Sequence, residues 1–233
     1  MRSLACAAVV VALSASLLAA EREGPTSAAL MAGTVPVTPA VGGTGRTGES
    51  NGPERLRVQW TQVPQLVVLM SVMRYHGGSG VEYSATTEVL SGAEADELIA
   101  DLTQALALLT DGRFSQFAAI HREVVQPGAT TRITRSGRIV VGRYDGIREL
   151  RQTVGFGGRV PDRDRGIASA AVLLDSGYDR TSSQRRLLRI HELGHALGYD
   201  HVDAHPSIMN PRIGTPPTDF DRQAARLSFS SRQ

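Results

Sequence analysis

The segment RIHELGHALGYDH, from Arg189 to His201, places three of the six histidines of this 233-residue chain within one short stretch. Histidines four residues apart on a helix lie on one face, a turn apart, so His191 and His195 can direct their imidazoles to one ion. Glu192 points to nearly the same side but is rotated around the helix. Its carboxylate is therefore expected beside the ion, within reach of a bound water, rather than on the ion itself.

Gly198 stands where a helix commonly ends in a left-handed residue. The chain can reverse there and bring His201 back as a third ligand. Three neutral imidazoles leave a fourth coordination position open, which is typical of a catalytic zinc site rather than a closed structural one. The same loop contains His205, which stays an alternative third ligand, although His201 has the matching spacing.

Hydrophobic periodicity gives a coarse prediction of the secondary structure. Residues 66–75 form an apolar run that fits a buried strand or a helix equally well. Residues 92–112 repeat leucine and alanine at helical spacing behind an acidic first turn, which predicts a helix. Another helix is expected to begin near the serines at 182 and 183 and to end at Gly198. Three further segments predict strands between turn residues: 117–125, 138–144 and 167–174.

The N-terminal residues 1–20 resemble a secretory signal peptide, because one arginine precedes an unbroken run of apolar and small residues. An uncleaved membrane anchor is the alternative, and Cys6 lies too near the start to serve as a lipid attachment site. Residues 21–53 are rich in Gly, Pro, Thr and Ser, which predicts a flexible linker or a short propeptide. We therefore expect one domain, residues 54–233, in a secreted, extracellular or periplasmic protein.

Composition excludes some classes of function and site. All 25 basic residues are arginines, but they are scattered and the formal net charge is only +2, so we expect no nucleic-acid partner. Cys6 is the only cysteine and lies inside the expected signal peptide. The mature domain should then have no disulfide and no thiolate ligand or nucleophile. We expect it to be a monomer.

HELGHALGYDH is similar to the zinc-binding signature of the metzincin peptidases, and SIMNP, residues 207–211, is similar to the methionine turn that follows it in that clan. The short gap between His201 and Met209 most resembles the matrixin branch. Astacin-like and serralysin-like relatives have a tyrosine two residues after that methionine, where this chain has Pro211. The resemblance therefore implies no tyrosine ligand.

The resemblance implies an α+β, zincin-like fold. It consists of a twisted mixed β-sheet, a helix packed on it, an active-site helix and a small C-terminal subdomain from about residue 202. It also implies a closing helix from Pro217, with Asp219 or Asp221 hydrogen-bonded back to the methionine turn, and Met209 as a floor beneath the metal. The stretch 212–220 would form the outer wall of a substrate pocket. The strand 168–174 would present its edge to an extended substrate.

The implied activity is that of a zinc-dependent endopeptidase acting on protein or peptide substrates. One Zn²⁺ would activate water, and Glu192 would be the general base. A non-catalytic zinc-containing binding module on the same fold is the alternative. The chain departs from matrixins because it has no cysteine to cap the zinc in a latent form. The only candidate ligands for a structural Ca²⁺ are Asp162, Asp164 and Asp175.

Cleavage after Ala20 should give a mature chain that begins near Glu21, or later if the linker is trimmed. N-terminal sequencing of secreted material measures this directly. Intact Met1 on membrane-bound protein would instead show that residues 1–20 are an anchor.

Overall fold

The computed structural model describes residues 52–76, 82–164 and 166–230. The predicted signal peptide and nearly all of the predicted linker lie outside these residues. Within them, no helix is both long and apolar enough to cross a bilayer. The strands are β1 (Gln65–Leu69), β2 (Ser71–Arg74), β3 (Glu82–Val89), β4 (Ile120–Glu123), β5 (Thr130–Arg132), β6 (Arg138–Asp145), β7 (Gly155–Pro161) and β8 (Ile167–Asp175). The helices are α1 (Gly92–Leu109), α2 (Ile147–Arg151), α3 (Ser176–Thr181), α4 (Arg185–Leu197) and α5 (Asp219–Phe229).

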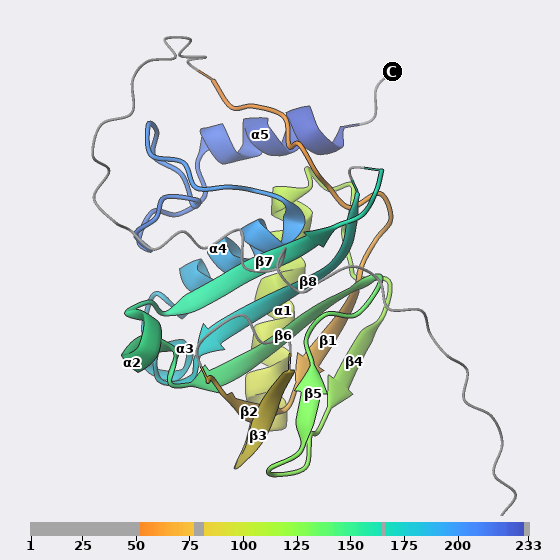
Figure 1. The fold of residues 1–233 in the computed structure, drawn as a ribbon. Helices are drawn as coiled ribbons and strands as arrows, with labels where there is room; N and C mark the ends of the chain where they lie inside the picture. The colour runs from red at the N-terminus through yellow and green to blue at the C-terminus, as the bar shows by residue number, and fades with distance from the viewer. Residues whose placement is uncertain (1–51, 77–81, 165, 231–233) are drawn as a thin grey trace, which may run out of the picture.

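All eight strands belong to one twisted, mixed sheet (Figure 1). β1 and β2 lie one after the other along one edge of β6, and β8 lies along its other edge; all these pairs are parallel. β4 continues the sheet beyond β1, and β3 and β5 continue it beyond β2. β7 runs antiparallel to β8 and ends the sheet on that side. The architecture is the α+β fold expected from the sequence.

The apolar run at 66–75 forms neither one strand nor a helix, but two strands separated at Met70. Its amide donates to Glu123 O of β4 at 2.8 Å, while its carbonyl accepts from the Leu90 amide beyond β3 at 2.7 Å. The chain therefore changes its hydrogen-bonding neighbour at this single residue, from β4 before it to the segment after β3. Nearly all of the run is buried, which explains why it shows no alternation that would have distinguished the two possibilities.

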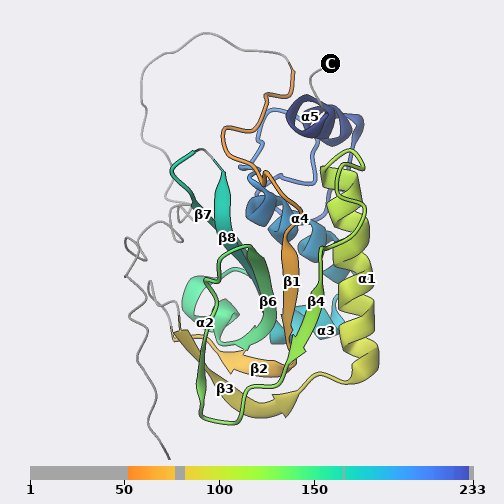
Figure 2. The same ribbon diagram turned by 90° about the vertical axis from the view of Figure 1, so that its right-hand side faces the viewer.

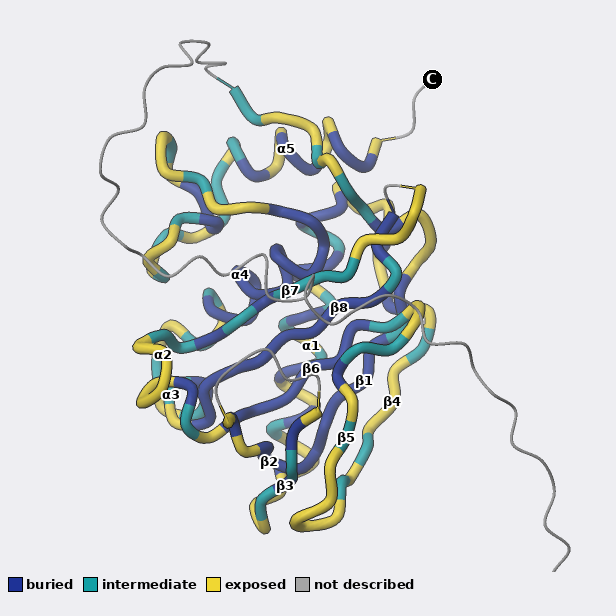
Figure 3. Tube along the Cα trace, in the orientation of Figure 1, coloured by how far each residue is buried: buried dark blue, intermediate teal, exposed yellow. Residues whose placement is uncertain are grey.

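Helices α1 and α4 pack on one face of the sheet, and α2 lies on the other, as Figure 2 shows. α1 begins at the capping box formed by Ser91 and Glu94, in agreement with the predicted start. Its buried side chains follow the predicted stripe: Ala95, Leu98, Leu102, Ala105, Leu106 and Leu109. Every residue of α4 from Leu188 to Leu197 is buried, between the sheet, α1 and the C-terminal segment (Figure 3).

The observed elements differ from the sequence-based prediction at three points. The GFGG segment that begins at Gly155 belongs to strand β7, which the sequence did not predict because glycine has low strand propensity. The strand predicted at 117–125 is only four residues long, Ile120–Glu123. α4 begins at Arg185, near the serines as predicted, but its N-cap residue is Gln184, and Ser182 is instead the C-cap residue of the short helix α3.

A buried ionic cluster joins α4 to the rest of the core. Asp179 of α3 accepts hydrogen bonds from Arg143 of β6 at 2.8 Å and from Arg189 of α4 at 2.7 and 2.9 Å. These three side chains are at most 2% exposed. Glu94 and Asp101 of α1 bind the outer nitrogens of the two arginines. Two guanidinium groups are therefore tolerated in the core because carboxylates from two helices satisfy them.

The substitution Asp179→Asn should lower the free energy of unfolding by about 3 kcal/mol, because it leaves two buried arginines with one fewer carboxylate. Urea unfolding in matched buffers measures the loss. The control is Asp96→Asn, which removes the carboxylate from an exposed ion pair with Arg122. The Arg122 side chain is 43% exposed and the Asp96 side chain 67% exposed. This substitution should change the free energy of unfolding by about 0–1 kcal/mol. Equal effects of the two substitutions would contradict a stabilising role for the buried cluster.

Candidate metal centre

The structure brings together the three histidines predicted from their spacing. His191 and His195 extend from α4, and His201 follows the turn at its end. The Nε2 atom of His195 lies 3.2 Å from the Nε2 atoms of both His191 and His201. One potential ligand atom from each ring lies within 4.8 Å of the others. Among the described residues, no other group of three such side chains converges in this way.

Hydrogen bonds fix which nitrogen of two of the rings faces the centre of this cluster. Nδ1 of His191 donates to Ile208 O at 2.7 Å, and Nδ1 of His195 donates to Tyr199 O at 2.9 Å. A carbonyl oxygen only accepts, so Nδ1 carries the proton and Nε2 of each neutral ring has a free lone pair. Two such lone pairs 3.2 Å apart cannot bond to each other. They are arranged as a chelating pair.

Burial favours the neutral form of all three rings, which metal ligation requires. Burial lowers the pKa of His191 to about 4 and the pKa of His195 to about 3. Burial also lowers the pKa of His201, although Asp203 and Asp200 act in the opposite direction. His191 and His195 therefore offer lone pairs instead of positive charges near neutral pH.

Glu192 lies beside the histidines but is not among the converging ligands. Its side chain is buried beneath β7, where its carboxylate accepts a hydrogen bond from the backbone amide of Gly157. Burial raises its pKa to about 8, and that hydrogen bond acts in the opposite direction. A dication among the neighbouring imidazoles would lower this pKa, because it stabilises the carboxylate.

Two glycines of β7 allow the strand to lie directly on α4. A Cβ atom at Gly155 would lie 2.6 Å from Oε1 of Glu192, and a Cβ atom at Gly157 would lie 2.7 Å from Cβ of His195. Real Cβ atoms do not approach other atoms so closely. The alternation of the strand places both glycines on the face toward α4 and Phe156 on the opposite face, where it stacks on Tyr75.

The turn that contains Met209 packs against α4 and contacts the first histidine through Ile208 O. A Cβ atom at Gly194 of α4 would overlap the sulfur of Met209. The absence of a side chain at this position therefore lets the methionine pack against the helix. The two oxygens of Asp221 accept from the hydroxyl of Ser207 and, at 3.1 Å, from the amide of Ile208. Of the two aspartates considered from the sequence, Asp221 therefore makes the bond to the turn.

Gly198 ends α4 in the left-handed conformation, with φ of 118°, as the sequence predicted. A side chain there would also overlap the carbonyl oxygen of Val58. The turn carries the chain back to His201. The alternative third ligand, His205, instead stacks on Phe220, with ring centroids 4.9 Å apart.

The three aspartates considered for calcium do not form one site. Asp162 lies just before β8, where its Oδ1 accepts from the amides of Asp164 and Gly166 at 2.8 and 2.6 Å. Asp175 is the last residue of that strand and accepts from the Tyr178 amide at the start of α3. The length of β8 separates them, so the structure gives no support to the predicted Ca²⁺ site.

The edge strand also differs from the expectation. The predicted edge at 168–174 belongs to β8, whose two sides are paired with β6 and β7. Within the part of the chain that the structure describes, β7 is paired on one side only. The strand beside the histidines that can accept a further strand is therefore β7.

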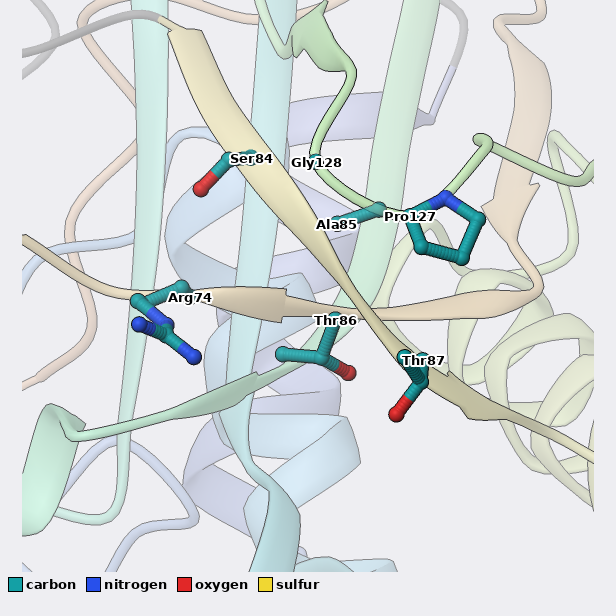
Figure 4. Close-up of a pocket in the computed structure, with 7 residues that line it drawn as sticks. All are labelled: Arg74, Ser84, Ala85, Thr86, Thr87, Pro127 and Gly128. Atoms are coloured by element: carbon teal, nitrogen blue, oxygen red, sulfur yellow. The ribbon is translucent and has the colours of Figure 1, made fainter.

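A hollow of about 360 Å³ lies away from the histidines, on β2 and β3 (Figure 4). The register between these strands shifts there, since Met73 is opposite Ala85 whereas Ser71 is opposite Val89. The extra residues of β3 bulge out and leave the hollow. Its lining contains none of the predicted site residues and consists of Arg74, Ser84, Ala85, Thr86, Thr87, Pro127 and Gly128.

No protein-family model and no curated protein matches this chain. Among solved structures, the chain is similar to metalloproteinase-II from Bacteroides fragilis, with a TM-score of 0.38 and 12% sequence identity. The similarity covers 78% of this chain and 58% of that one. So distant a likeness carries no argument about function, which must come from the geometry of the site.

The substitution His201→Ala should abolish tight zinc binding, whereas His205→Ala should leave the wild-type stoichiometry of one zinc per chain, because only His201 joins the converging set. Elemental analysis of dialysed protein measures both. Zinc loss in the His205 variant alone would reverse the assignment of the third ligand.

Proposed function

We propose that this chain is a zinc-dependent endopeptidase. The observation that supports the proposal best is the combination of three converging imidazoles with a buried carboxylate, Glu192, that is left out of their cluster. A purely structural zinc site closes its coordination with a fourth protein ligand. Among the described residues, no fourth protein group joins these histidines.

Two of the three separations between the ligand nitrogens fit Zn²⁺. Zn–N bonds of about 2.0–2.1 Å in tetrahedral geometry separate neighbouring nitrogens by about 3.3 Å. The separations from Nε2 of His195 to the other two Nε2 atoms are 3.2 Å. Neutral imidazoles whose Nδ1 atoms donate to carbonyls are typical of histidines that bind zinc. His191, His195 and His201 would thus hold the ion.

Zinc in such a site lowers the pKa of water toward neutrality and polarises a carbonyl group. Glu192 would take the proton from the attacking water and deliver it to the amine of the leaving peptide. The amide of Gly157 holds the carboxylate against β7. Met209 would support the imidazoles from beneath through its contact with α4 at Gly194, without acting as a ligand.

The proposed substrates are protein or peptide segments in extended conformation. The free side of β7 offers backbone amides and carbonyls next to Glu192, so a substrate strand could pair with it. Backbone pairing needs chain on both sides of the cleaved bond, which favours an endopeptidase. The residues of the proposed outer wall, 212–220, include Ile213, which packs against the core.

Residues 1–20 support secretion of this enzyme, and the proposal places it outside the cytoplasm on that basis alone. The second candidate is a secreted zinc-containing module that binds ligands without turnover. Such a module has no need of an unliganded, buried carboxylate beside its histidines. Glu192 therefore distinguishes the two functions.

The substitution Glu192→Gln should retain zinc but lower the rate of cleavage of an unstructured protein substrate by a factor of about 10² to 10⁴, because it removes the base and keeps the shape. Peptide cleavage and zinc content are measured on the same preparations. Chelation should abolish the activity of the wild type, and added zinc should restore it.

The control for this experiment is Glu149→Gln, which makes the same change at an exposed glutamate on α2 and should leave activity unchanged. If the Glu192 variant cleaves as fast as the wild type, or if the zinc-loaded wild type cleaves none of a diverse peptide library, the chain is not a peptidase of this kind.

A further inference from the structure

Arg159 connects the edge strand to the end of the helix that carries the first two histidines. It follows Gly155 and Gly157 on the face of β7 toward α4. Its Nη1 atom donates to the carbonyl oxygens of His195 at 3.3 Å and Tyr199 at 3.5 Å. Its Nη2 atom donates to Oδ1 of Asp200 at 2.9 Å. The guanidinium thus spans the turn between the second and third histidines, and the side chain is only 18% exposed.

The groups that Arg159 contacts determine where two of the three imidazoles lie. Tyr199 O is also the acceptor for Nδ1 of His195 and so fixes the orientation of that ring. His195 O is one of the last carbonyls of α4 and also accepts from the Gly198 amide at 3.2 Å. Asp200 directly precedes His201 in the chain.

We propose that Arg159 is a positioning residue of the metal centre, which holds the turn 198–200 so that His195 and His201 converge. A guanidinium suits this task because its donors lie in one plane at fixed angles and can reach several acceptors at once. Its positive charge also lies at the C-terminal end of α4, where the helix dipole favours a cation. The inference rests on the proposed zinc site.

A second consequence concerns the proposed substrate. Arg159 belongs to the strand whose free side the substrate would occupy, and it binds the turn that carries the third histidine. Movement of β7 would therefore be transmitted to His201 through one side chain. Gly157 makes the corresponding link from β7 to Glu192.

The test uses zinc alone, without any peptide. The dissociation constant of zinc is measured by competition with a chromophoric chelator, and the absorption spectrum of the Co²⁺-substituted protein reports the ligand geometry. Arg159→Gln should weaken zinc binding about tenfold, at the lower end of the range for groups that orient metal ligands. Arg159→Lys keeps the charge but reaches fewer acceptors, so its effect should be intermediate.

Arg122→Gln is the matched control, because Arg122 lies on β4, elsewhere in the same sheet, in an exposed ion pair with Asp96. It should leave the zinc dissociation constant unchanged. Asp200→Asn removes the negative charge of one of the three acceptors of Arg159 and so weakens that hydrogen bond. The position is 75% exposed, so this variant should fold and bind zinc about threefold more weakly.

Wild-type zinc affinity in all the variants, with an unaltered Co²⁺ spectrum, would overturn the inference and show that Arg159 only stabilises the fold. If Arg159→Gln does not fold, Arg159→Lys and Asp200→Asn decide, and unchanged zinc binding in both overturns it. Failure of the wild type to bind zinc would instead refute the proposed function, so the two outcomes are distinct.

Discussion

The arrangement of the site depends on the close approach of strand β7 to helix α4. Gly155 and Gly157 bring the backbone of the strand against Glu192 and His195, at distances that any side chain would prevent. This approach puts the Gly157 amide on the Glu192 carboxylate and gives Arg159 its reach to the end of the helix. The buried polar side chains of this helix need hydrogen-bond partners, and for Glu192 the strand supplies one in the Gly157 amide.

The sequence predicted that the three histidine side chains converge, because their positions follow from helix geometry and a single left-handed glycine. It also predicted α1 and the link from the C-terminal helix to the methionine turn, which is made by Asp221. It failed for β7, because glycines chosen for close packing carry no strand propensity. It gave no indication of Arg159 or Gly194, because their roles depend on segments that only the fold brings together.

Helix α4 contains two different electrostatic environments a few residues apart. Arg189 keeps its charge in the core because Asp179 and Asp101 surround it. At His191 and His195, burial without a facing carboxylate lowers the pKa values and favours neutral rings. Acidic partners on α1 and α3 therefore preserve a buried charge in one turn of the helix, whereas burial without such partners favours the neutral form in the next.

The acceptor for Nδ1 of His191 is Ile208 O, in a turn that Asp221 of α5 holds in place. Both groups follow the three histidines in the chain, so they are synthesised after them. A growing polypeptide can contain all three histidines and still lack the groups that orient the first ring. The orientation of His191 therefore depends on segments that are made later than the histidines themselves.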